Sequence, residues 1–268
     1  MHSALDKISI VLVEPSHPGN IGSVARAMKT MGLSDLVLVN PKKFPHSEAT
    51  KLSAGAESVL EQARVVESLE QAISDCTLVM GTSVRDREVG WPTANPSLSA
   101  AEMVDHLEQA SEHQVAILFG RESSGLSNQE MDCCHSQIRI DANIEYSSLN
   151  LASAVQIISY ELRMKSAASQ VFNSVERVSQ VPTTPAQERQ RLATQAELNG
   201  HLEHLQNTLL ALNFSKSKKP TLLMRKLTRL YNKARLTLEE IQILRGILTA
   251  YSDKVSFERG KRDTADKD

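Results

Sequence analysis

The chain has 268 residues, of which 41% are hydrophobic and 23% charged, as in ordinary globular domains, and its net charge is −2. Its three cysteines, two of them adjacent, exclude a disulfide framework, and no stretch approaches the roughly 20 apolar residues of a membrane helix. The start, Met1 to Lys7, lacks the basic and apolar segments of a secretory signal. We therefore expect a soluble cytoplasmic protein without a membrane partner.

The first part of the chain alternates strand and helix signals. Ile8–Val13 is a short apolar run typical of a strand buried on both faces, and a helical pattern follows from Asn20 to Met31, closed by Gly32. The longest helical pattern runs from Ser148 to Met164. Further strands are predicted at Leu36–Val39, Arg64–Val66, Thr77–Met80, Val115–Phe119 and Gln137–Ile140. The predicted helix N-caps are Ser68, Ser99, and Ser127 or Asn128. This alternation predicts an α/β fold, a parallel sheet with helices on both faces.

The second part reads as helical throughout. Thr184 and Pro185 predict the start of a helix that runs to about Leu212. A second helix is predicted over Leu222–Ala234, and a capping box of Thr237 and Glu240 opens a third that ends near Asp253. The charged tail from Glu258 is expected to be disordered. The predicted division is a domain at 1–164, a linker at 165–184, a small C-terminal helical domain at 185–255 and a disordered tail at 256–268.

Two common nucleotide-binding motifs are missing from the sequence. It contains neither the glycine-lysine pattern of a P-loop nor any G-x-G of a Rossmann fingerprint. Instead, three segments follow predicted strands, at the edge where open parallel sheets bind ligands. They are Asn20–Arg26, Phe119–Leu126 and Ser147–Ala152. Each alone reads as a helix cap or glycine turn, but their combination and order indicate one shared site.

In their order, these three segments resemble motifs one, two and three of the SPOUT methyltransferases, and in particular the bacterial tRNA (cytidine/uridine-32) 2′-O-methyltransferases. The resemblance runs from about Ile8 to Met164 and is looser after Lys165. It implies a C-terminal trefoil knot in the catalytic domain, S-adenosylmethionine as methyl donor, and a homodimer. It also implies 2′-O-methylation of the ribose at nucleotide 32 in the tRNA anticodon loop.

The resemblance assigns the cofactor loops residue by residue. Gly120 and Gly125 permit close backbone approach and positive φ, and Ser147 or Ser148 is expected to cap the following helix. The implied cofactor-binding residues are Thr82, Ser83, Val84, Gly120, Arg121, Glu122, Ile140, Ser147, Ser148, Leu149 and Asn150.

On the acceptor side, the resemblance implies Asn20 and Arg26 as catalytic residues. Arg26 lies nearly two turns into the first helix, on the face of Ser23 rather than with Val24 and Met28. A charged guanidinium is a poor proton acceptor, so holding a phosphate or stabilising the developing alkoxide is favoured. A general-base role stays open, as does a solvated arginine with no role.

A run of positive charge suggests where tRNA binds. Between Asn213 and Arg235 there are eight basic residues and no acidic one, so the rest of the chain carries −10. On the helix, the basic face is expected opposite a packing face of Leu223, Leu227 and Leu230. The predicted tRNA-binding residues are Lys216, Lys218, Lys219, Arg225, Arg229 and Lys233.

Several alternatives compete with this interpretation. Adjacent Cys133 and Cys134 with His135 lack the spacing of a zinc site, so no metal is expected. Within the family, the enzyme could act on another tRNA position, on ribosomal RNA or on a base. Outside it, a catalytically inactive RNA-binding module and a nucleotide-dependent dehydrogenase are weaker alternatives. The apolar side of the Leu149–Leu162 helix could serve the core or a dimer interface.

Overall fold

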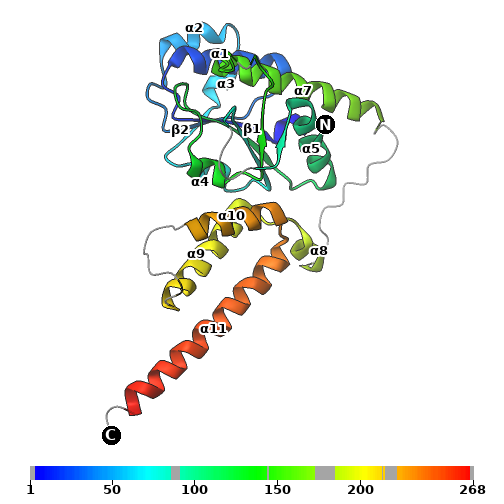
Figure 1. Cartoon of the computed structure of the whole chain (residues 1–268). Helices are drawn as coiled ribbons and strands as arrows, with labels where there is room; N and C mark the ends of the chain where they lie inside the picture. The colour runs from blue at the N-terminus through cyan, green and yellow to red at the C-terminus, as the bar shows by residue number, and fades with distance from the viewer. Residues whose placement is uncertain are drawn as a thin grey trace. The chain divides into compact units, whose positions relative to one another are not determined.

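The computed structural model describes residues 4–85, 91–143, 145–172, 185–212, 214 and 222–265 (Figure 1). The chain divides into two compact units, Met1–Val181 and Pro182–Asp268. The first contains the sheet and the second is helical, as the sequence predicted for its two parts.

A seven-stranded parallel sheet forms the centre of the first unit, with strand order β3-β2-β1-β6-β4-β7-β5. The strands are β1 (Ile8–Val13), β2 (Leu36–Val39), β3 (Arg64–Val66), β4 (Leu78–Thr82), β5 (Thr93–Ala94), β6 (Val115–Phe119) and β7 (Ser136–Ile138). The predicted parallel sheet is confirmed. The two-residue β5 was not predicted, because so short a strand leaves no periodic pattern.

Helices cover both faces of this sheet. They are η1 (Ala4–Lys7), α1 (Pro18–Met31), α2 (Ser47–Ser53), α3 (Glu57–Glu61), α4 (Leu69–Ile73), α5 (Pro96–Gln109), α6 (Asn128–Asp132) and α7 (Leu151–Phe172). Figure 1 shows α1, α2, α3, α5 and α7 on one side and α4 on the other. Alternate residues of β1 face the two sides of the sheet. Ile10 and Leu12 pack in the cluster that contains α1 and α7, and Val11 and Val13 pack in the cluster that contains α4.

Several helix starts differ from the prediction. α5 is capped by Asn95, not Ser99, because Pro96 follows it at the first helical position and its side chain accepts from the amide of Leu98 at 2.9 Å. α7 begins at Leu151, where Asn150 accepts from the Ala152 amide at 2.9 Å, so neither Ser147 nor Ser148 is the cap. The predicted caps Ser68 and Ser127 are present.

α7 also ends later than predicted. It continues past Met164 to Phe172 and so occupies the first part of the predicted linker. The extension packs along α5, where Ser166 is buried, Lys165 pairs with Asp105 at 3.6 Å, and Ser169 donates to Glu108. Its inner apolar side chains, Leu151, Val155, Ile158 and Leu162, are buried in the core of this unit.

The helical unit contains α8 (Pro185–Gln190), α9 (Gln195–Ala211), α10 (Leu222–Ala234) and α11 (Leu238–Ala265). The single helix predicted from Pro185 to Leu212 is wrong: the chain breaks after Gln190, and a capping box of Thr194 and Glu197 starts α9. The predicted box of Thr237 and Glu240 opens α11, with amide-to-side-chain distances of 2.8 and 3.3 Å. α11 runs to Ala265, beyond the helix end that the sequence predicted near Asp253.

Packing in this unit is modest and partly polar. Leu198, Leu202, Met224 and Ile241 form its buried cluster. Beside them, buried Gln195 donates to Asn232 at 3.1 Å, which ties α9 to α10. A buried histidine, His201, lies edge-on to Tyr231 with ring centres 4.9 Å apart.

Candidate active site

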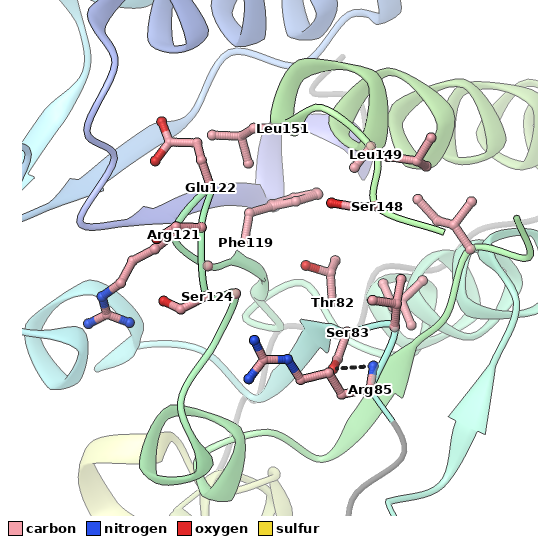
Figure 2. Close-up of a pocket in the computed structure, with 17 residues that line it drawn as sticks. Thr82, Ser83, Arg85, Phe119, Arg121, Glu122, Ser124, Ser148, Leu149 and Leu151 are labelled. Carbon is pink, nitrogen blue, oxygen red and sulfur yellow. Dashed lines mark hydrogen bonds between the residues drawn. The ribbon is translucent and has the colours of Figure 1, made fainter. Parts of the chain in front are cut away.

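A cavity opens at the carboxyl edge of the sheet, between the loops that follow β4 and β6 and the segment that leads into α7 (Figure 2). The site therefore lies at the carboxyl ends of parallel strands, the edge where open parallel sheets bind ligands. Its lining combines hydroxyls with apolar side chains: Thr82, Ser83, Val84, Arg85, Phe119, Gly120, Arg121, Glu122, Ser123, Ser124, Gly125, Ile138, Ile140, Ser148, Leu149, Leu151 and Ala154.

Most of the predicted cofactor residues come together here. Of the eleven, only Ser147 and Asn150 are not among the lining residues. The lining residues that were not predicted as binding residues are Arg85, Phe119, Ser123, Ser124, Gly125, Ile138, Leu151 and Ala154. Phe119 begins the second motif segment, so the sequence does carry a signal for it. Ala154 carries none, because it reaches the cavity only through the start of α7.

Position 120 requires a glycine because the backbone of Gly125 lies too close to leave room for a side chain. A Cβ at this position would lie 2.0 Å from the carbonyl carbon of Gly125, and Gly125 itself has φ 66°. The amide of Gly125 donates to the carbonyl of Arg121 at 2.8 Å, and the two residues form an isolated antiparallel bridge. The loop after β6 is thus folded tightly back on itself, and its residues 120–125 all belong to the cavity lining.

Glu122 connects this loop to the turn before α1. Its carboxylate accepts from the Ser16 hydroxyl at 2.9 Å, from the Ser16 and His17 amides at 3.2 Å, and from the Asn20 amide group at 3.0 Å. Burial alone would raise the pKa of Glu122, but the hydrogen bonds from Asn20 and Ser16 prevail and lower it to about 2. Glu122 is therefore ionised at neutral pH and serves as an organising acceptor.

Asn20 in turn connects this turn to the start of α7. Its side-chain oxygen accepts from the Asn150 amide group at 3.2 Å, while its own amide group donates to Glu122. Asn150 also caps α7 through its oxygen. One chain of hydrogen bonds, Glu122–Asn20–Asn150, thus joins the three predicted motif segments. Predicted catalytic Asn20 and predicted cofactor residue Asn150 both lie in this chain rather than in the cavity lining.

Arg121 is one of the lining residues, and its guanidinium pairs with Glu14 and Glu130 at 2.8 and 3.0 Å. Figure 2 shows the guanidinium turned away from Thr82 and Ser148. Arg85, by contrast, lies at the cavity beside Ser124, and its amide donates to the Ser83 hydroxyl at 3.2 Å.

Arg26 lies on the exposed face of α1, with Val24 and Met28 buried on the other side, as predicted. It is six residues beyond Asn20, about 9 Å along the helix axis, and does not line the cavity. Among the residues that the structure describes, nothing pairs with its guanidinium. The charge is thus available to an external anion.

The predicted tRNA-binding residues divide into two sets. Lys216, Lys218 and Lys219 lie outside the described residues. On α10, Lys233 is exposed, whereas Arg225 and Arg229 are half-buried. The predicted packing face is also wrong at Leu230, which is 59% exposed, because Met224 and Asn232 fill the buried positions instead. Lys226, which was not predicted as a contact, shares the exposed side with Lys233.

Two other functional classes find no support in the described part of the chain. No three histidine, cysteine or acidic side chains in it are grouped to hold a metal ion. His135 instead accepts from the Val79 amide at 3.0 Å, and Cys134 is buried. None of the described helices combines the length and apolarity that crossing a bilayer requires.

Comparison with known proteins identifies the family of the chain. Residues 7–160 match the SpoU rRNA Methylase family, and residues 196–262 match the C-terminal domain of the tRNA methyltransferase TrmJ. The tRNA (cytidine/uridine/adenosine-2′-O-)-methyltransferase TrmJ of Pseudomonas aeruginosa (strain UCBPP-PA14) is 45% identical over 91% of this chain and 93% of its own. The Escherichia coli K12 tRNA (cytidine/uridine-2′-O-)-methyltransferase TrmJ is 46% identical over 92% and 95%.

Solved structures give the same result. TrmJ from Zymomonas mobilis ZM4 superposes with a TM-score of 0.76 at 33% identity, covering 91% of this chain and 98% of that one. A probable methylase family protein from Haemophilus influenzae Rd KW20 has a TM-score of 0.60 at 40% identity, covering 95% and 99%. The resemblance found in the sequence is confirmed, and the chain belongs to the SpoU methylase family, in the group defined by the TrmJ C-terminal domain.

Proposed function

We propose that the protein transfers a methyl group from S-adenosylmethionine to the ribose 2′-hydroxyl of nucleotide 32 in the tRNA anticodon loop. The observation that carries this proposal is the Glu122–Asn20–Asn150 chain, which joins the three motif segments around one cavity. Family membership and relatives that span nearly the whole chain support the reaction class.

The cavity fits the methyl donor. The folded-back Gly120–Gly125 loop and Ser83 present polar groups that suit an adenine edge and the charged methionine end. Phe119, Ile138 and Leu149 supply apolar contacts for the rest of the molecule. The proposed cofactor contacts are therefore the predicted residues that line this cavity. The threaded trefoil knot that the resemblance implies at these loops belongs to the same proposal.

Alignment accounts for most of the proposed catalysis. The sulfonium supplies an activated methyl group, so the protein has to hold a 2′-oxygen in line with it. Asn20, fixed on both sides by Glu122 and Asn150, sets the start of α1 at the edge of this cavity. The guanidinium of Arg26 has no ion-pair partner among the described residues, and its charge suits a phosphate or the developing alkoxide.

The proposed enzyme is a cytoplasmic homodimer. Ile157, Tyr160 and Met164 recur at helical spacing on the outer side of α7 and are exposed, which suits a face that a second copy covers. Because Arg26 does not line the cavity of its own copy, the second copy supplies it to the acceptor site in this proposal. The exposed side of α10, with Lys226 and Lys233, contributes to holding tRNA.

The target nucleotide is tested by mass spectrometry of tRNA after reaction with the purified enzyme. We expect one 2′-O-methylated ribose at position 32, and none in a transcript with a 2′-deoxyribose there. Transcripts with each base at position 32 measure base preference. Methylation elsewhere in tRNA, or only in ribosomal RNA, would reject the proposed substrate while retaining the reaction.

Mixing two inactive variants tests whether each active site combines the cavity of one copy with Arg26 of the other. Ser148→Trp blocks the cavity from an exposed loop position, and Arg26→Ala removes the acceptor-side charge. Each variant alone should be inactive. Random mixing of subunits makes half of the dimers hybrid, each with one intact site, so activity should recover to about a quarter. No recovery after verified subunit exchange would place Arg26 at the cavity of its own copy.

A further inference from the structure

The guanidinium of Arg121 is almost fully occupied by the protein itself. Its Nε and Nη2 contact the Glu14 carboxylate at 2.9 and 2.8 Å, and its Nη1 and Nη2 donate to Glu130 at 3.1 and 3.0 Å. Four of its five N–H donors are thereby used. The side chain is only 25% exposed. These contacts leave little capacity for a ligand.

Strand pairing places these groups together. β1 and β6 pair in parallel with Ile8 opposite Val115 and Leu12 opposite Phe119. Continuing this register past the ends of both strands brings Glu14 opposite Arg121. Glu14 has φ 47°, an unfavourable backbone for a non-glycine residue, and its amide donates to Val39 at 2.8 Å. The chain therefore holds this carboxylate at the sheet edge at a conformational cost.

Glu130 is equally fixed. It closes the capping box of α6, where the Ser127 amide donates to it at 2.7 Å, and it is 14% exposed. Burial raises the pKa of Glu130, but hydrogen bonds from Arg121 and Ser127 prevail and lower it. The pKa of Glu14 is also lowered, chiefly by its hydrogen bond from Arg121. Both carboxylates are ionised at neutral pH, so the group of three carries a net charge of −1.

A net negative group is unsuited to bind the carboxylate of the methyl donor. It is well suited to fix a loop, since Arg121 belongs to the cavity lining and its carbonyl accepts from the Gly125 amide. The next residue, Glu122, already binds the turn before α1. Consecutive residues thus attach the loop after β6 to the segment after β1, with Arg121 also reaching α6.

We propose that Arg121 is a positioning residue rather than a cofactor ligand: through Glu14 and Glu130 it holds the loop after β6 in its cofactor-binding shape. This inference rests on the proposed cofactor site. It revises the role that the resemblance implied for Arg121, and it gives Glu14, which no sequence motif identified, a part in cofactor binding.

A double-mutant cycle tests this inference in the full-length enzyme. S-adenosylmethionine affinity is measured by isothermal titration for Glu14→Gln, Arg121→Gln and the double variant, at temperatures where each is folded. We expect each single variant to weaken binding about tenfold and the double variant no more than either, because the pair acts as a unit. If Arg121 bound the cofactor directly, Glu14→Gln would leave affinity unchanged or improve it, which would overturn the proposal.

Two controls make the result specific. Arg64→Gln removes a comparable ion pair, with Asp35 at 3.3 Å on the same sheet but outside the cavity, and should leave affinity unchanged. If Arg121→Gln does not fold, Glu14→Gln alone decides the point, since its side chain is 40% exposed. Ser148→Trp separates the two proposals. If this variant binds S-adenosylmethionine unchanged, the cofactor site itself is rejected. If it loses binding while Glu14→Gln keeps the wild-type affinity, only the role of Arg121 is rejected.

Discussion

Replacing Glu122 by glutamine should remove the central acceptor of the site. The carboxylate accepts from four donors, and an amide group in its place would set its own N–H groups against those of Asn20 and the Ser16 backbone. Lowering a pKa from 4.5 to about 2 corresponds to roughly 3.4 kcal/mol. Because the group is partly exposed, solvent screening reduces this, and we expect a loss of about 1.5–2 kcal/mol.

The single tryptophan gives a direct assay. Trp91 is buried in the sheet unit, so its fluorescence during urea unfolding reports the stability of that unit alone. The stabilisation from Glu122 is full above pH 4.5 and is lost as the pH falls toward 2, because the folded pKa is the lower one. The difference between wild type and Glu122→Gln should therefore shrink from pH 7 to pH 3. Glu61→Gln, at an exposed carboxylate, is the control; an equal effect of both variants at pH 7 would refute the reasoning.

Arg26→Ala should abolish turnover with little change in S-adenosylmethionine affinity; a weakened affinity would contradict an acceptor-side role. Asn150→Asp should keep the α7 cap but lose the donor to Asn20, so turnover should fall at nearly unchanged stability, and normal turnover would show that this link is dispensable. Lys226→Gln with Lys233→Gln should lower the salt dependence of tRNA binding by about 0.7–0.9 log units of slope per lost phosphate contact, unless that side of α10 is only solvated surface. Burial lowers the pKa of His201, so the fold favours the neutral ring, and the stability that depends on it is present above pH 6.5 and is lost as the pH falls through the lower folded pKa. His201→Leu should therefore flatten the pH dependence of thermal unfolding, followed by circular dichroism, between pH 7 and 5.

The sequence predicted the sheet well because its central strands are buried on both faces and read as short, largely apolar runs. Ile8–Val13 and Val115–Phe119 were predicted to the residue for this reason. Helix starts were harder, since a cap depends on which of several polar side chains reaches the free amides. Asn95 is preferred over Ser99, and Thr194 starts a second helix within the single one predicted from Pro185, through local geometry that composition does not display. A charged tail likewise gave no sign that α11 extends to Ala265.

The candidate site was predictable where a motif carries its own chemistry, as in the loop from Gly120 to Gly125. It was not predictable where a residue acts through the strand register. Nothing in the sequence near Glu14 indicates that its partner is 107 positions away, because the pairing of β1 with β6 becomes visible only in the sheet. A slip of one residue between these strands would separate Glu14 from Arg121 and Ser16 from Glu122 together. The sheet therefore does more than carry the loops: by fixing this single register, it determines whether the acceptor-side turn and the proposed cofactor loop meet at all.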